Sequence, residues 1–211
     1  MNKRITVLVD NDSWILPHAI ELVDGLLKIG FDALLVREHK LVKKGWINFM
    51  LGCIKIMPEE CLSKNEHNLV VHESELPQGK GFAPMTWQIL EGKNEIPICL
   101  IEATKDVDAG KIWLKDLIKL DGTELNLEWR NIQGIKSVEL CLQFVNNYQN
   151  LHSVEQIGEH SSYSKRRPEN SELDINISLK KQLNLLRVVD NDNYPAFFYV
   201  EGQKYILKIE K

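Results

Sequence analysis

The stretch "RITVLVDNDSWILPHAIELVDGLLKIG", from Arg4 to Gly30, decides the fold class of this chain. Residues 4–10 form a short apolar, β-branched run, which is typical of a strand buried on both faces of a parallel sheet. Residues 13–30 then place apolar side chains at helical spacing and stop at a glycine. A buried strand that leads directly into a helix predicts an α/β protein.

The same alternation continues as far as residue 104. Short apolar runs predict further strands at residues 31–38, 53–57, 67–73 and 96–104, and residues 81–94 predict a helix with a glycine stop. Strands that alternate with helices indicate right-handed crossovers. We therefore expect a Rossmann-like, mostly parallel sheet flanked by helices.

The pattern then changes to one long helix, predicted at residues 121–148. Thr123 is its expected N-cap, and we expect a break at Gly134, because a glycine inside a helix costs about 1 kcal/mol against alanine.

The last part of the chain predicts a small extension rather than a second full domain. Residues 149–176 are polar and irregular, residues 178–189 predict a short helix, and residues 196–211 predict a β-hairpin that turns at Glu201-Gly202. The expected division is a catalytic domain at residues 1–150 and a C-terminal extension at residues 151–211.

Composition excludes several classes of function. The formal charge is -4, from 26 Lys+Arg and 30 Asp+Glu, so nucleic acid is not an expected partner. The four cysteines lack paired spacing, which argues against zinc and disulfides and favours a reduced, cytoplasmic compartment. No apolar run approaches the ~18 residues of a membrane span, so we expect no membrane association. The oligomeric state is left open, with a homodimer as one option.

Polar side chains follow three of the predicted strands, at residues 10–13, at His72 and at residues 104–108. In parallel sheets ligands gather at the carboxyl ends of strands, so these groups are expected to share a crevice. A zinc motif of the form H-E-x-x-H is not present, because position 76 is Leu76. Nucleophile-elbow, phosphate-loop and dinucleotide motifs are also missing from the sequence.

Residues 72–113 read "HESELPQGKGFAPMTWQILEGKNEIPICLIEATKDVDAGKIW". This stretch resembles the core of the folate-dependent formyltransferases, the family of methionyl-tRNA and sugar N-formyltransferases. The family core has Asn-x-His, a Leu-Pro stretch, a glycine-led helix with a tryptophan, and an Asp-x-Gly loop. The matching residues here are, in order, His72, Leu76, Pro77, Gly81, Trp87, Asp108 and Gly110. His72 and Asp108 are 36 residues apart, as the family pattern leads one to expect. Residues 162–174 and 185–207 resemble segments that follow the core in sugar N-formyltransferases.

The resemblance implies transfer of a formyl group from 10-formyltetrahydrofolate to a free amine, without a metal. His72 would donate a hydrogen bond or a proton to the developing oxyanion and protonate the departing nitrogen. Asp108 would orient the imidazole, stabilise its cation and help to deprotonate the amine. The family asparagine would fall at Val70, and Asn68, on the same strand face, is the candidate replacement. A strand-capping role for Asn68 is the alternative.

The resemblance also implies two sets of binding residues. Folate would be bound by Met57, Cys61, Leu62, Lys80, Gly81, Thr104 and Val107. The acceptor would be bound by Ser13, Trp14, Tyr163, Arg166, Arg167, Arg187 and Asp190. The adjacent arginines Arg166 and Arg167 are suited to a diphosphate.

The expected acceptor is a nucleotide-linked amino sugar. The family's methionyl-tRNA members are longer and need a positive surface for tRNA, and purine-precursor members lack the tail segments. The short forms resemble enzymes that act on UDP-linked 4-amino-4,6-dideoxy sugars in pseudaminic-type glycan pathways. The alternatives are a formyltransferase for another small amine, such as a purine precursor, and a non-catalytic folate or sugar-nucleotide binding protein, which Val70 would support.

Overall fold

The computed structural model describes residues 3–211, and a six-stranded sheet forms its centre. The strands lie in the order β2-β1-β3-β4-β6-β7; the first four are parallel, and β6 and β7 are antiparallel additions at one edge. Their bounds are β1 (Arg4–Leu8), β2 (Asp32–Val36), β3 (Gly45–Met50), β4 (Asn65–His72), β6 (Glu95–Glu102) and β7 (Ile112–Lys119). The predicted α/β fold with a mostly parallel sheet is confirmed.

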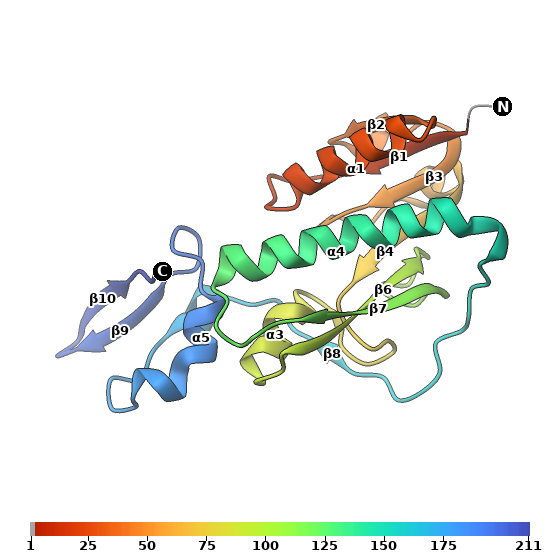
Figure 1. Cartoon of the computed structure of the whole chain (residues 1–211). Helices are drawn as coiled ribbons and strands as arrows, with labels where there is room; N and C mark the ends of the chain where they lie inside the picture. Colours follow the sequence, from red (N-terminus) through yellow and green to blue (C-terminus); the bar gives the residue numbers. More distant parts are fainter. Residues whose placement is uncertain (1–2) are drawn as a thin grey trace.

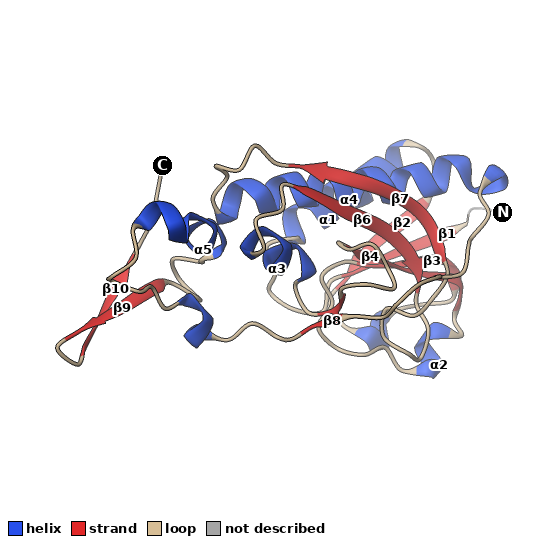
Figure 2. Ribbon diagram, turned by 90° about the horizontal axis from the view of Figure 1, so that it is seen from below, coloured by secondary structure: helices blue, strands red, loops and turns tan. Residues whose placement is uncertain are grey.

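Helices cover both faces of this sheet. The helices α1 (Leu16–Lys28) and α4 (Asn126–Asn147) lie together on one face (Figures 1 and 2). The helix α3 (Pro84–Leu90) packs with β6 and with the first turns of α4. The short helix α2 (Glu59–Leu62) lies on the other face. Strand alternation produces this division: Ile5 and Val7 pack with Phe144 of α4, whereas Leu8 packs with Cys61 of α2.

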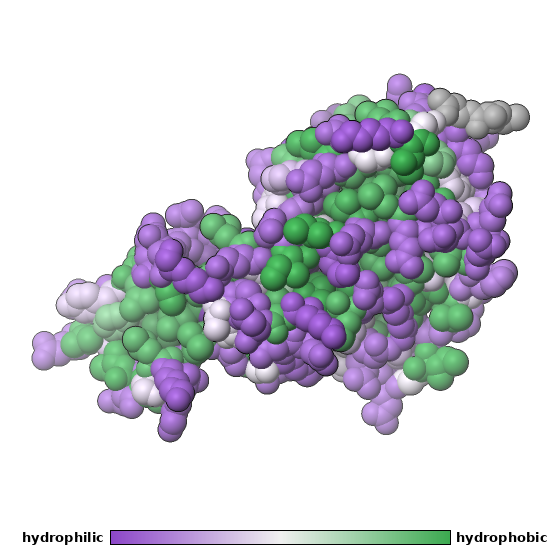
Figure 3. All heavy atoms as spheres, in the orientation of Figure 1, coloured by the Kyte–Doolittle hydropathy of each residue, from purple (hydrophilic) through white to green (hydrophobic). Residues whose placement is uncertain are grey.

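The C-terminal extension leaves the sheet and ends in a hairpin. β8 (Ser162–Tyr163) pairs with β5 (Lys80–Gly81), and α5 (Leu183–Val188) follows. β9 (Ala196–Val200) and β10 (Gln203–Leu207) form the hairpin, which projects from the sheet in Figure 1. It turns at Glu201 and Gly202, both with positive φ, as predicted. Figure 3 shows apolar side chains gathered on this extension, where Tyr205 and Ile206 are exposed.

One strand prediction is wrong, and two strands of the sheet were not predicted. Residues 53–57 form no strand; they form a loop in which the N–H groups of Ile54 and Lys55 donate to the Asp10 carboxylate instead of a sheet neighbour. The strand of this region is β3, which ends at Met50, two residues before Gly52. The sequence analysis also missed β7, which pairs antiparallel with β6 and therefore needs no crossover helix.

The long helix α4 is continuous through Gly134, so the predicted break is wrong. The predicted N-cap Thr123 is also wrong, because the helix begins after Leu125, whose N–H donates to the Glu128 carboxylate at 2.7 Å. Packing explains the glycine. A Cβ at position 134 would lie 2.1 Å from Cδ2 of His18 on α1, so the buried His18 ring occupies the space that a side chain here would need.

Gly134→Ala is therefore expected to destabilise the protein by about 1–3 kcal/mol, because overpacking exceeds the helix-propensity gain of about 1 kcal/mol. Urea unfolding followed by circular dichroism measures the change. Gly25→Ala on α1 is the matched control, since its Cβ would meet Leu142 at an ordinary 3.5 Å and should leave stability unchanged or raised. Equal effects of the two substitutions would contradict this account of Gly134.

No helix within residues 3–211 is long and apolar enough to cross a membrane. The same described residues contain no group of three or more His, Cys, Asp or Glu side chains placed to hold a metal ion.

Candidate active site

A cavity of about 530 Å³ lies at the carboxyl end of β3 and β4. Its volume is in the range of about 300–1,000 Å³ that is usual for small-molecule sites. The wall is formed by the loop after β3, the end of β4, residues 81–86, the loop after β6, and one face of α4. The cavity therefore brings together His72, Thr104 and Asp108, as the sequence predicted, whereas none of residues 10–13 lines it.

His72 and Asp108 both line this cavity. Nδ1 of His72 lies 3.6 Å from Oδ1 of Asp108, and the two side chains are only 6% and 11% exposed. Nε2 of His72 lies 2.9 Å from the Gly79 carbonyl oxygen, which can only accept, so Nε2 carries a hydrogen. This bond orients the ring and leaves Nδ1, beside the carboxylate, as the nitrogen able to exchange a proton.

Asp108 reaches His72 through a loop rather than from a parallel strand end. β6 is antiparallel to β4, so the carboxyl end of β6, at Glu102, pairs with Leu69 in the middle of β4. Residues 103–111, which connect β6 to β7, therefore fold back along the cavity toward His72. Asp108 has a φ of 52°, and the Gly81 N–H donates to its Oδ2 at 2.8 Å. Gln156 donates to the main-chain carbonyls of Asp108 and Gly110.

Gly81 is required at its position in this arrangement. Its φ is 97°, and a Cβ there would lie 2.5 Å from the Tyr163 carbonyl oxygen, in the β5–β8 pair. A side chain would push β8 away and move the N–H group that holds the Asp108 carboxylate.

Most of the predicted folate residues are brought to the cavity. Met57, Leu62, Gly81, Thr104 and Val107 line it, whereas Cys61 and Lys80 do not. Cys61 is buried in the apolar cluster behind the wall, and Lys80 pairs through its main chain with Ser162.

Asp10 holds the loop at residues 52–57 that forms part of this wall. Its carboxylate accepts from the N–H groups of Ile54 and Lys55, each at 3.0 Å, and lies 3.0 Å from Nε2 of His39. Burial alone would raise the pKa of Asp10, but these hydrogen bonds and that from Asn11 outweigh it and hold the pKa below its usual value. Asp10 thus stays ionised and keeps the loop in place.

Cys53 on the same loop also lines the cavity, so a thiol nucleophile must be considered. Burial raises the pKa of the Cys53 thiol to about 12, which leaves it neutral and weakly nucleophilic near pH 7. All four cysteines are free.

Asn68 is not among the residues that line the cavity. Its amide donates to the Leu62 carbonyl at 2.8 Å, and its Oδ1 lies 3.4 Å from Nδ2 of Asn48. Val70 occupies the cavity wall instead. The structure thus places Asn68 in a buried contact that fixes the end of α2 and does not bring it to His72.

Of the predicted acceptor residues, only Trp14 lines the cavity. Ser13 precedes it and lies beside Gly52, outside the wall. Tyr163 stacks on Trp87 and donates its hydroxyl to Glu91. Tyr163 thus connects the extension to α3 instead of facing the cavity.

The three predicted arginines lie outside the cavity and have different surroundings. Arg166 donates to the Val188 and Asn170 carbonyls and to the Ser171 hydroxyl, so its guanidinium organises the extension. Arg167 is exposed. Neither is placed at the cavity wall.

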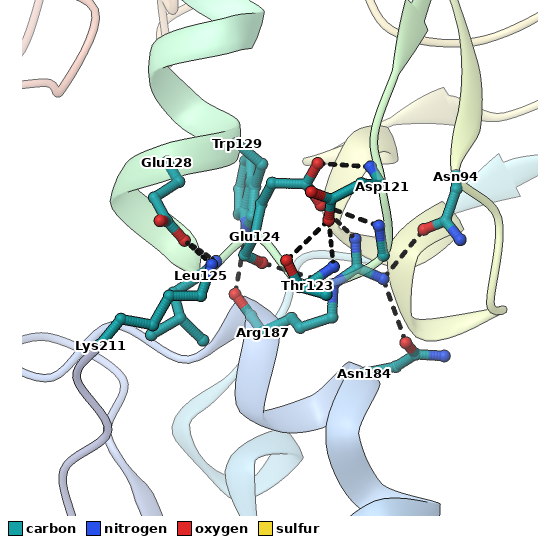
Figure 4. Close-up of polar contacts among 11 residues, drawn as sticks. Asn94, Asp121, Thr123, Glu124, Leu125, Glu128, Trp129, Asn184, Arg187 and Lys211 are labelled. Carbon is teal, nitrogen blue, oxygen red and sulfur yellow. Dashed lines mark hydrogen bonds and ion pairs between the residues drawn. The ribbon is translucent and has the colours of Figure 1, made fainter.

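Arg187 is buried, with its side chain only 1% exposed, and it does not line the cavity. Figure 4 shows its guanidinium between the Glu124 carboxylate, 3.2 Å away, and the amide oxygens of Asn94 and Asn184. The Arg187 carbonyl also accepts from the Trp129 indole. Arg187 thus fixes α5 to the start of α4.

The sequence analysis missed the side chains that α4 contributes. Arg130, Gln133 and Ser137 line the cavity, spaced as one helix face, and Glu73 and Thr86 lie on the same wall. Asp190, a predicted acceptor residue, lies behind Arg130 at 3.4 Å. Burial lowers the pKa of Arg130, and the charge of Asp190 opposes that shift. In the sequence, Arg130, Gln133 and Ser137 follow one another at spacings of three and four, which places them on one face of the predicted helix.

Comparison with known proteins identifies the segment that contains this site. Residues 43–129 match the family model described as Formyl transferase. This formyl transferase segment includes His72, Asp108 and most of the cavity wall.

Curated relatives with significant similarity include methionyl-tRNA formyltransferases. The protein from Sulfurihydrogenibium sp. is 35% identical over 68 residues, 32% of this chain and 22% of its own length. The protein from Ehrlichia ruminantium is 27% identical over 155 residues, 71% of this chain and 48% of its own length. The chain thus spans about half or less of the length of the curated relatives it matches.

Solved structures share the fold at low sequence identity. Methionyl-tRNA formyltransferase from Clostridium thermocellum has a TM-score of 0.80 and 18% identity, covering 96% of this chain and 90% of that one. A 4-N formyltransferase from Francisella tularensis has a TM-score of 0.73 and 17% identity, covering 99% and 97%. HypX from Aquifex aeolicus, in complex with tetrahydrofolic acid, has a TM-score of 0.77 and 19% identity, covering 97% and 37%.

Proposed function

We propose that this protein transfers a formyl group from 10-formyltetrahydrofolate to the free amine of a nucleotide-linked amino sugar. The observation that carries the proposal is the His72–Asp108 pair on the wall of a cavity of about 530 Å³, within the formyl transferase segment. The fold shared with a 4-N formyltransferase and with a tetrahydrofolate complex supports both substrates.

The cavity also fits a folate in its chemistry. Met57, Leu62 and Val70 offer an apolar wall for a flat ring, and the main chain of residues 104–107 offers donors and acceptors at its edge. When bound, 10-formyltetrahydrofolate supplies the activated formyl group.

The chain's own residues would carry out the proton transfers and hold the developing charge. The imidazole, fixed by the Gly79 carbonyl, presents Nδ1 beside Asp108, where a proton can be taken up and returned. The Asp108 carboxylate favours the imidazolium, which would stabilise negative charge on the formyl oxygen. The Gly81 N–H and Gln156 keep that carboxylate in place.

Incubation of the pure protein with 10-formyltetrahydrofolate and a panel of UDP- and dTDP-linked 4-amino-4,6-dideoxy sugars should produce one sugar nucleotide heavier by one formyl group. Mass spectrometry detects the product, and the 4-hydroxy sugar nucleotides are the matched control because they lack the amine. Formylation of a purine precursor instead would replace the proposed acceptor. Binding of folate and sugar nucleotide without transfer would favour the binding protein.

A further inference from the structure

The side of the cavity formed by α4 carries hydrogen-bond-accepting oxygens to which no ligand has been assigned. We define the α4 wall as Trp14, Glu73, Thr86, Arg130, Gln133 and Ser137, all of which line the cavity. Gln133 is 7% exposed, and its side-chain oxygen Oε1 has no hydrogen-bond partner among the described residues. Buried polar atoms normally have partners, so this oxygen points to a missing donor.

Glu73 places a carboxyl group at the same corner. It follows His72, and strand alternation directs its side chain to the α4 face while His72 faces Gly79. Its main-chain carbonyl accepts from Nε2 of Gln88 at 2.6 Å, which fixes the end of β4 independently of the carboxyl group. A carboxylate and an amide oxygen thus lie beside the His72–Asp108 pair.

The geometry points to a binding site for the acceptor's amine: Glu73 and Gln133 accept hydrogen bonds from it, and the Glu73 carboxylate removes a proton from its ammonium form. An ammonium group has three donors and no acceptor, which suits two oxygen acceptors. One N–H bond breaks, one O–H bond forms on Glu73, and the electron pair stays on nitrogen. The proton then passes to water. This inference rests on the proposed function and assigns the amine end of its acceptor.

The charges around Glu73 determine how this step depends on pH. Burial raises the pKa of the Glu73 carboxyl; the charge of His72 and a contact with Gln133 oppose the rise, and Asp108 adds to it. Arg130 is the cationic side chain of α4 on this wall. Because only the carboxylate can accept the proton, capture of the acceptor should increase as the pH rises through the pKa of Glu73.

Glu73→Gln should therefore raise the KM for the acceptor at least tenfold near pH 7, with unchanged affinity for tetrahydrofolate. In this variant the fall of kcat/KM toward acid pH should no longer follow the titration of Glu73. It should follow that of the acceptor's amine instead, so that kcat/KM recovers toward the parent value at alkaline pH, where the amine is already neutral. Glu75→Gln is the matched control, since that exposed carboxylate pairs with Lys115 outside the cavity. Gln133→Leu is a second variant, which should also raise the KM while retaining the acid limb.

Calorimetry separates this inference from the proposed function. Binding of a UDP-linked 4-amino-4,6-dideoxy sugar and of its 4-hydroxy counterpart is measured with tetrahydrofolate present. A preference for the amine that Glu73→Gln abolishes supports the inference, even if no formyl transfer is detected and the proposed function fails. Formyl transfer by the parent protein with an unchanged KM and pH profile in Glu73→Gln and Gln133→Leu would overturn the inference alone. Absence of both transfer and amine preference would overturn both.

Discussion

His72→Asn is expected to lower turnover by a factor on the order of one hundred or more, with little change in the affinity for either substrate. Asparagine keeps a hydrogen-bond donor near the position of Nδ1, but it is too short to reach the Gly79 carbonyl as Nε2 of His72 does, and it cannot carry a proton beside Asp108. Steady-state kinetics measures turnover, and thermal unfolding tests the fold. His160→Asn, at an exposed position, is the control.

Asp108→Asn extends the same experiment to the other member of the pair. It should reduce turnover at least as much, because it removes the charge that favours the imidazolium and converts an acceptor of the Gly81 N–H into an amide. The double variant should lose much less than the product of the single losses, since the two residues act as a unit. Independent, multiplying losses, or near-normal turnover in His72→Asn, would remove the catalytic role from this pair.

Arg187→Ala is expected to destabilise the protein by about 3–5 kcal/mol, because it leaves the buried Glu124 carboxylate without its cation. The loss also removes the donors to Asn94 and Asn184 and loosens α5 from α4. Denaturant unfolding measures the change. Arg167→Ala is the matched control in an exposed position and should leave stability within about 0.5 kcal/mol.

A second variant tests whether charge burial causes this loss. Replacing both Arg187 and Glu124 with methionine removes the uncompensated charge and should recover much of the stability that Arg187→Ala loses. If Arg187→Ala were as stable as the parent but had a raised KM for the sugar nucleotide, Arg187 would be an acceptor residue after all, as its position in the family-like tail first indicated.

The parts of the fold that could be predicted are those with local causes. The period of the apolar residues defines β1, α1 and β4, and Glu201-Gly202 defines the hairpin turn. His72 and Asp108 could be paired from the order and spacing of the family motifs, which do not depend on β6 being antiparallel to β4. The strand predicted at residues 53–57 failed because Asp10, distant in sequence, takes the N–H groups that a strand would offer to a neighbour.

The parts of the site that could not be predicted depend on packing between distant segments. Arg130 and Gln133 were predicted only as part of the long helix, and it is the folded chain that brings their face of α4 to the cavity at the ends of β3 and β4. Arg166 was predicted to bind a ligand because arginine suits a diphosphate, and Arg187 because the tail resembles that of sugar N-formyltransferases. Their partners, Glu124 and the Val188 carbonyl, are recognisable only in the folded chain.

The contact between Gln156 and the loop that carries Asp108 limits how such a chain can diversify. Gln156 belongs to residues 151–211, yet it holds the carbonyls of Asp108 and Gly110, and β8 of the same segment pairs with Gly81. Replacing residues 151–211 with those of a relative would therefore also replace the residues that hold the Asp108 loop and Gly81. A tail taken from a relative should therefore lower turnover unless it also supplies a donor to the carbonyls of Asp108 and Gly110.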